Sequence, residues 1–240
     1  MSDGTPVGAG ATLEVFADIA CPFTHVGLQR VTARRAALGR VGPVLRVRAW
    51  PLELVNGEAL SGSAMAPKVE ALRRSVAPGS FAGFDPTTFP ASTRPALASV
   101  SAAYRVGPER GERFSLAVRD ALFEQGRDVS DPDVLAELRA LLGVGDPTPA
   151  DVSSIDADFA EGTARGVVGS PHFFTPQGDF FCPSLEIAKV DGELAVAFDG
   201  EGFDAFMAAV FPVVRVSRVA SRPDQGPGAR GGRAGPQASG

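Results

Sequence analysis

The segment from Leu13 to Val31, LEVFADIACPFTHVGLQRV, constrains the fold of this chain most, because a short apolar run passes directly into a helical pattern. Residues 13–18 are typical of a β-strand. Pro22 then falls in what should be the first helical turn, where its missing N–H removes no hydrogen bond. The helix should continue to about residue 38 and end near Gly39. The pattern therefore predicts Cys21 at the point where a strand meets a helix N-terminus.

A cysteine in this position is a candidate for chemistry. The N-terminus of a helix carries partial positive charge and free N–H groups, which stabilise a thiolate over a thiol. The alternative is that Cys21 is only a small buried residue between the two elements. Cys182 is the one other cysteine, and two distant cysteines do not make a disulfide framework. Cys182 is more typical of a buried structural residue, but a role in resolving a disulfide at Cys21 stays open.

The remaining pattern predicts an α/β core interrupted by helices. Residues 44–50 alternate like a second strand, and the middle of the chain carries apolar stripes at helical spacing. Asp131 and Pro132 are typical of a helix start. A helix is expected over 154–165, then a hairpin with its turn at Gln177-Gly178 between two Phe pairs, then a last helix. The apolar residues of that last helix are Phe203, Phe206, Met207, Val210 and Phe211. The expected order is β-α-β, a helical block, and α-β-β-α.

Composition excludes some classes of function. The net charge of −5 over 240 residues argues against a nucleic-acid binder, which would carry a basic stripe. No apolar run approaches the roughly 20 residues of a membrane helix, and the first ten residues do not resemble a secretory signal. We therefore expect a cytoplasmic protein without nucleic-acid or membrane partners. Residues 1–10 and the tail 217–240, rich in Gly, Pro and Arg, are expected to be disordered.

Four stretches of the sequence resemble one family when taken in order. They are DIACPFTHVGL, WPLELVN, ALFEQGRDVSDPDVLAELRALLGV and GVVGSPHFF. They resemble the DsbA-like branch of the thioredoxin superfamily, which includes thiol-disulfide oxidoreductases, kappa-class glutathione transferases and 2-hydroxychromene-2-carboxylate isomerases. The resemblance implies a thioredoxin fold with an all-helical insertion. It divides the chain into a thioredoxin-like domain of residues 11–54 and 146–216 and a helical insertion of residues 55–145.

The resemblance also implies a site. Pro171 corresponds to the family's cis-proline, and Ser170 before it offers backbone groups to an incoming thiol or peptide. Thr24 stands where a dithiol enzyme has its second cysteine, so ordinary dithiol exchange by the motif itself is excluded. The Thr24 hydroxyl could donate to a thiolate, or it could bond its own helix backbone at the surface. The isomerase and transferase relatives usually have Ser at the Cys21 position, which this chain does not match.

Other side chains are weaker candidates. His25, on the same helix face as Cys21, and His172, beside Pro171, are the only histidines, and either imidazole could exchange a proton with Cys21. We favour that role for His172 and a structural role for His25. Phe23 and Asn56 are candidate ligand contacts by resemblance, and Trp50 is more typical of core. No metal site is expected, because no paired ligand spacing occurs.

The resulting hypothesis is a monothiol oxidoreductase in which Cys21 forms a mixed disulfide that a low-molecular-weight thiol resolves. No tightly bound cofactor is expected. The thiol is glutathione or mycothiol, the latter because an Arg-rich, Lys-poor composition suggests a high-GC genome such as an actinobacterial one. Partners are this thiol and a disulfide or electrophilic substrate, and a homodimer stays open. The alternatives are a thiol-dependent isomerase or transferase acting on an aromatic substrate, and a non-catalytic binding protein with this fold.

Overall fold

The computed structural model describes residues 11–211. The two segments expected to be disordered, 1–10 and 217–240, lie outside this range. Four strands form the main sheet in the order β2-β1-β3-β4. Their bounds are β1 Thr12–Ala17, β2 Val44–Ala49, β3 His172–Thr175 and β4 Gly178–Phe181. Strands β1 and β2 are parallel and are joined by helix α1 (Pro22–Ala37), whereas β3 and β4 are antiparallel to their neighbours. The expected β-α-β start is confirmed.

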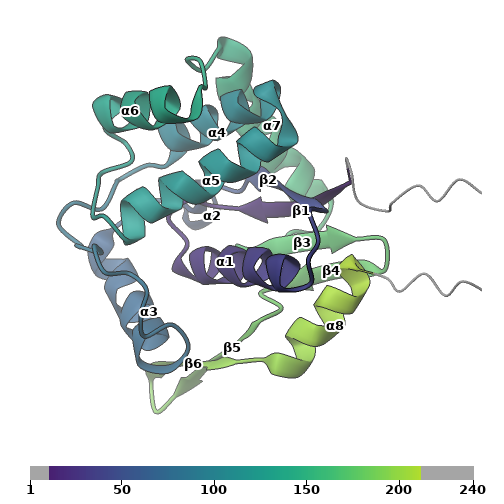
Figure 1. The fold of residues 1–240 in the computed structure, drawn as a ribbon. Coiled ribbons are helices and arrows are strands. Elements are labelled where there is room, and N and C mark those ends of the chain that lie inside the picture. Colours follow the sequence, from purple (N-terminus) through teal and green to yellow (C-terminus); the bar gives the residue numbers. More distant parts are fainter. Residues whose placement is uncertain (1–10, 212–240) are drawn as a thin grey trace, which may run out of the picture.

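Helices cover both faces of the sheet (Figure 1). On one face Phe173 of β3 packs against Phe206 of α8 (Gly200–Val210), with 4.7 Å between ring centroids. On the other face Phe16 packs against Trp50, under α7 (Pro149–Ala164). Gly162 of α7 lies so close to these rings that an added Cβ would approach Trp50 to 2.7 Å. Neighbouring residues of a strand therefore pack against opposite layers of helices, because successive side chains of a strand point to opposite faces of the sheet.

Side chains from three helices cover the outer edge of β2. An edge strand presents unpaired backbone groups that must find partners when buried. Here its alternate backbone N–H groups donate to side chains of α4 (Arg94–Val106), α5 (Pro108–Phe123) and α7. The three pairs are Leu45 with Glu112 at 2.6 Å, Val47 with Tyr104 at 2.9 Å, and Ala49 with Asp158 at 2.9 Å. Strand β2 is thus joined to the helices by hydrogen bonds as well as by apolar packing.

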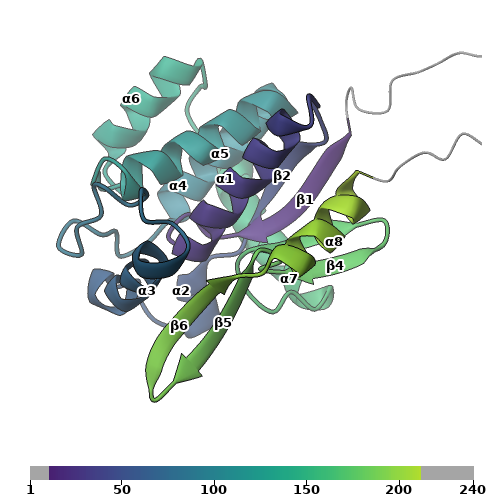
Figure 2. The same ribbon diagram turned by 60° about the horizontal axis from the view of Figure 1, so that its bottom comes forward.

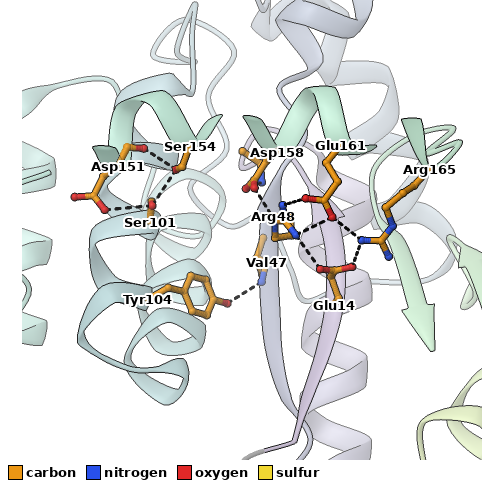
Figure 3. A network of polar contacts seen from close by, with 11 residues as sticks. Glu14, Val47, Arg48, Ser101, Tyr104, Asp151, Ser154, Asp158, Glu161 and Arg165 are labelled. Carbon is orange, nitrogen blue, oxygen red and sulfur yellow. Dashed lines mark hydrogen bonds and ion pairs between the residues drawn. The ribbon is translucent and has the colours of Figure 1, made fainter. Parts of the chain in front are cut away.

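Arg48 of β2 fixes α7 to this face of the sheet (Figure 3). Its guanidinium contacts Glu14 at 2.9 Å, and Asp158 and Glu161 of α7 at 2.6 Å each. Burial by itself would lower the pKa of Arg48, but the surrounding carboxylates outweigh it and raise the pKa above its usual value. Because one cation serves three carboxylates from two elements, the network orients α7 relative to β1 and β2.

The rest of the chain forms the helical block and a second hairpin. The helices are α2 (Leu52–Asn56), α3 (Gly62–Ser75), α4, α5 and α6 (Pro132–Leu142). Strands β5 (Leu185–Val190) and β6 (Glu193–Phe198) form a separate two-stranded sheet. Figure 2 shows this hairpin extending from the body of the molecule beside α3. The sequence prediction missed it, because most of its side chains are exposed and its alternation does not mark a buried face.

Local boundaries differ from the prediction at two places. Helix α7 begins five residues earlier than expected, because the Thr148 side chain caps it. In return, the Asp151 carboxylate accepts a hydrogen bond from the Thr148 backbone N–H at 2.7 Å. The first hairpin turns at Pro176-Gln177 rather than at Gln177-Gly178, since Thr175 pairs with Gly178. Proline is favoured as the second residue of a turn. The expected cap at Asp131 is confirmed, as its carboxylate accepts from the Asp133 N–H at 2.8 Å.

Candidate functional site

Cys21 is the residue that caps α1, and its side chain points away from its own helix. Its backbone is extended, with φ −81° and ψ 113°, and its sulfur makes no capping bond. The thiol instead donates to the carbonyl oxygen of Ser170 at 3.0 Å. The side chain is 3% exposed. The thiol therefore faces the loop that connects α7 to β3.

The loop before β3 is fixed against the end of β1 and the start of α1. The Ser170–Pro171 peptide bond is cis, and the family resemblance predicts a cis bond here. The Ser170 hydroxyl accepts from the Asp18 N–H at 2.9 Å and shares a 2.7 Å hydrogen bond with the Thr24 hydroxyl. Pro171 packs on α1 at Gly27, where an added Cβ would lie 3.6 Å from its ring. The Ser170 carbonyl is consequently held at one position relative to Cys21.

Thr24 and Phe23 lie in different surroundings, although they are adjacent. Thr24 is fully buried and its hydroxyl bonds Ser170, so it is neither a surface residue nor a direct partner of the Cys21 sulfur. Phe23 is half-buried and packs against the main core. Thr24 therefore reaches the thiol only through Ser170, whose backbone carbonyl accepts the Cys21 hydrogen bond.

Cys182 lies next to the same loop, just after β4. Its N–H donates to the carbonyl of Pro171 at 3.1 Å, and its sulfur lies 3.9 Å from the Ser170 oxygen that Cys21 contacts. Both cysteines are free thiols. Burial raises the pKa of the Cys182 thiol well above its usual value, and the neighbouring Cys21 acts in the same direction. Cys182 also has a φ of +44°, which non-glycine residues seldom adopt.

His172 is held away from the thiols. Its Nδ1 accepts from the Val168 N–H at 3.2 Å, its Nε2 lies 2.8 Å from the Asp179 carboxylate, and its ring stacks on Phe174. Phe174 belongs to the face covered by α7, since it packs against Phe16. Within residues 11–211, the hydrogen bonds of this imidazole go to Val168 and Asp179 and none goes to Cys21. The structure therefore does not bring His172 together with the residues around the Ser170 carbonyl.

His25 is buried between α1 and the helical block. Its Nε2 lies 2.7 Å from the Glu124 carboxylate, which also accepts from the N–H of Phe81 at 2.9 Å. The rings of Phe81 and Phe123 pack against the imidazole, with centroids 5.3 and 5.0 Å away. Burial lowers the pKa of His25, although Glu124 opposes the shift. His25 joins α1 to the helical block, and it lies inside this cluster rather than at the surface.

Asp18 and Arg119 are two buried ionisable residues near Cys21, which sequence reasoning missed. The Asp18 carboxylate accepts from the N–H groups of Ala20 and Leu52 at 2.7 and 2.5 Å and from the Thr93 hydroxyl at 2.9 Å. Burial raises the pKa of Asp18 above its usual value. An acidic residue at the end of an apolar strand, three positions before the cysteine, was the available signal.

Arg119 supplies a positive charge to this region. Its Nη2 donates to the Asp18 carbonyl at 3.1 Å, and its Nη1 donates to the Ser115 carbonyl at 2.7 Å. Complete burial lowers the pKa of Arg119 to about 10, although Asp18 and a negative charge on Cys21 both favour its protonated form. The guanidinium is therefore charged at neutral pH, and it lies near enough to Cys21 to attract a thiolate.

Asn56 is not at the thiol but in a separate open pocket of about 570 Å³. Lys68 and Glu58 also line this pocket, as do Leu60 and Met65. The latter two pack against Ala20, which directly precedes Cys21. Leu60 and Met65 thus connect the lining of this pocket to the residue before Cys21. Trp50 is buried in the core, as the sequence indicated.

The sequence and the thiol site agree with one known family. A family model described as DSBA-like thioredoxin domain matches residues 12–195. The chain belongs to this family. The match includes the Cys-Pro segment, the helical block and the cis-proline loop of this DSBA-like chain. Among curated proteins no match is found.

Solved structures show the same fold. A 2-hydroxychromene-2-carboxylate isomerase has a TM-score of 0.55 at 17% identity, over 71% of this chain and 88% of its own. The cytosolic disulfide reductase DsbM from Pseudomonas aeruginosa, in a structure with GSH, has a TM-score of 0.51 at 20% identity, over 82% and 96%. A putative protein disulfide isomerase from Nitrosomonas europaea has a TM-score of 0.50 at 17% identity, over 70% and 87%.

Within residues 11–211 no helix is long and apolar enough to cross a membrane. In the same range no group of three or more His, Cys, Asp and Glu side chains is arranged to hold a metal ion.

Proposed function

We propose that this DSBA-like protein is a thiol oxidoreductase in which Cys21 is the nucleophile and a low-molecular-weight thiol such as glutathione is the co-substrate. The observation that carries the proposal is the position of the Cys21 sulfur, at the N-terminus of α1 and 3.0 Å from the Ser170 carbonyl. The Cys-Pro helix start and the loop before β3 meet at this point. In support, one solved structure of the same fold is a disulfide reductase with GSH bound.

The chemistry follows from the surroundings of Cys21. Its thiolate attacks a substrate disulfide, forms a mixed disulfide and releases one substrate thiol. The free N–H groups of the first turn of α1 and the buried Arg119 cation attract the negative charge of this thiolate. Thr24 acts as a positioning residue, because its hydroxyl holds Ser170 opposite the sulfur. Pro171 packs on α1 and keeps the loop in place.

The co-substrate needs a place near Cys21. We assign the body of the small thiol to the pocket that contains Asn56 and Lys68. An amide and an ammonium group are suited to the carboxylates of a peptide-like thiol. The volume of about 570 Å³ is within the range of small-molecule sites. Leu60 and Met65 line this pocket and cluster with Ala20, so their movement is the step by which the bound thiol would reach the Cys21 sulfur.

The proposal is tested by the mass of the intact protein after incubation with oxidised glutathione. Two single-cysteine variants, Cys182→Ser and Cys21→Ser, are compared under the same conditions. We expect one glutathionyl group on the variant that keeps Cys21, and release of that group when reduced glutathione is added. An adduct of similar yield on the Cys21→Ser protein, or no adduct on the Cys182→Ser protein, would contradict the proposal.

A further inference from the structure

The two cysteines of this chain meet at one atom. The sulfur of Cys21 lies 3.0 Å and that of Cys182 lies 3.9 Å from the carbonyl oxygen of Ser170. The two residues come from different elements, the start of α1 and the end of β4. A single buried cysteine usually packs as a small apolar residue. Two cysteines whose sulfur atoms contact the same oxygen call for another explanation.

The backbone of Cys182 is fixed by hydrogen bonds of both its N–H and its carbonyl. Its N–H bonds the Pro171 carbonyl at 3.1 Å, and its own carbonyl accepts from the Leu185 N–H at 3.0 Å. Its φ of +44° lies in the left-handed region, which costs energy for a residue with a side chain. Glycine would adopt this backbone conformation more easily. The position of the Cys182 sulfur near the Ser170 oxygen is a reason for cysteine at this place.

We propose that Cys182 is a second redox residue of this site, which attacks the mixed disulfide on Cys21 and closes an internal Cys21–Cys182 disulfide. The proposal rests on the proposed function, since it needs the adduct on Cys21. It adds that resolution proceeds inside the protein when the external thiol is scarce. The internal disulfide then holds the site in an inactive, oxidised form until reduced thiol returns.

The two steps balance. The Cys21 thiolate attacks a disulfide RSSR, the substrate S–S bond breaks, and one RS⁻ leaves and takes up a proton. Cys182 loses its proton and attacks the Cys21 sulfur, so the bond between Cys21 and R–S breaks and a second RS⁻ leaves and is protonated. Two cysteine thiols have been oxidised to one disulfide, and RSSR has been reduced to two RSH. Two molecules of a small thiol reverse the process.

The surroundings set the order of the two cysteines. Burial holds the Cys182 thiol protonated, and a negative charge on Cys21 raises its pKa further. Cys182 is therefore the poorer nucleophile while Cys21 is free. Once Cys21 is in a mixed disulfide it carries no charge, so one of the two causes that keep Cys182 protonated is gone. Reaction at Cys21 thus prepares Cys182 for the second step.

The experiment follows the fate of the adduct without added thiol. Wild type, Cys182→Ser and Ser184→Ala are treated briefly with oxidised glutathione, freed of reagent, and followed by intact mass and peptide mapping. Ser184→Ala is the matched control, because it changes a buried residue of the same turn and keeps both thiols. Circular dichroism confirms that each variant is folded.

The expected result separates the two proposals. In wild type and Ser184→Ala the glutathionyl group is lost, and a peptide linked through Cys21 and Cys182 forms. In Cys182→Ser the adduct persists at least tenfold longer. Equal adduct lifetimes in wild type and Cys182→Ser, or a glutathionyl group on Cys182, would overturn the internal disulfide and leave the proposed function standing. Absence of any adduct on Cys182→Ser would overturn both.

Discussion

Cys21 and Cys182 direct their sulfur atoms at a single carbonyl oxygen, that of Ser170, at 3.0 and 3.9 Å. The Cys-x-x-Thr motif lacks its second thiol in sequence, yet the fold places another thiol beside the Ser170-Pro171 loop that faces the motif. The second thiol is on a strand end rather than in the helix, so it has no helix N-terminus to stabilise its charge. This difference in surroundings underlies the different roles that we propose for the two cysteines.

The resolving step should accelerate as the pH rises. Burial raises the pKa of Cys182, and it does so also when Cys21 is in the mixed disulfide, so the reactive thiolate is a minor species that grows roughly tenfold per pH unit below that pKa. Loss of the glutathionyl group from wild type should therefore still accelerate above pH 9, where an ordinary thiol, with a pKa of about 8.5, is already saturated. Timed mass measurements give this profile. A rate that levels off near pH 8 would contradict the assignment of the step to Cys182.

Removal of the Thr24 hydroxyl should slow the reaction of Cys21. Thr24→Val keeps the shape but removes one of the two buried partners of the Ser170 hydroxyl and leaves only the Asp18 N–H, which costs about 1–3 kcal/mol. We expect several-fold slower adduct formation with oxidised glutathione, because the loop opposite the sulfur loses its anchor.

Two variants serve as controls for Thr24. Thr32→Val makes the same change on the same helix, where the hydroxyl bonds only the helix carbonyls of Leu28 and Gln29, and it should leave the rate unchanged. Thr24→Ser keeps a hydroxyl and should restore most of the rate. If Thr24→Ser is as slow as Thr24→Val, the methyl group rather than the hydroxyl positions the loop.

Tyr104→Phe should destabilise the edge of the sheet. The Tyr104 hydroxyl accepts from the Val47 N–H at 2.9 Å and donates to the Leu45 carbonyl at 2.7 Å. Its loss leaves two buried backbone groups of β2 without partners, so the free energy of unfolding should fall by about 1–3 kcal/mol. Urea denaturation followed by circular dichroism measures the change. An unchanged midpoint would show that water replaces the hydroxyl at this edge.

His25 should make the protein less stable in mild acid. Burial lowers the pKa of His25, and Arg119 acts in the same direction, whereas Glu124 and Asp120 oppose it. A histidine with a lowered pKa binds its proton more readily in the unfolded chain, so stability is complete above the ordinary value of about 6.5 and is lost as the pH falls below it.

The variant His25→Gln tests this prediction, because it keeps a hydrogen-bonding side chain beside Glu124 but does not titrate. The difference in unfolding free energy between pH 7.5 and pH 5.5 should be smaller for the variant than for wild type. Below pH 5 both proteins should lose stability alike as carboxylates such as Glu124, whose pKa is lowered, become protonated. The same pH dependence in both proteins would contradict the role of His25.

Local sequence signals located the strand, the helix and the hairpin that surround Cys21. The apolar run before Cys21, Pro22 at the first helical position and the two Phe pairs around a turn are each read from neighbouring residues, and the structure confirms the strand, the helix and the hairpin they predict. The cis-proline at Ser170-Pro171 was likewise predicted, in this case from the family resemblance. These features depend on backbone preferences over a few residues, which the sequence carries directly.

Contacts between distant segments were not available in this way. The turn at Pro176-Gln177 shifts the hairpin register from the predicted one, and this register places Cys182 beside Pro171. Asp18 could be noticed as an acidic residue after an apolar strand, but its contact with Arg119 could not, because nothing local indicates that a helix in the insertion reaches the end of β1.

The sequence by itself determined that Cys21 caps a helix, that its motif has no second thiol, and that the surrounding elements build a DSBA-like fold. Only the tertiary structure decided which groups face the sulfur. It placed Ser170 and Cys182 there, and turned His172 toward Asp179. The physical reason is that side-chain direction on a strand changes with every residue. A small shift in strand register therefore changes which residues meet, although it alters no local sequence pattern.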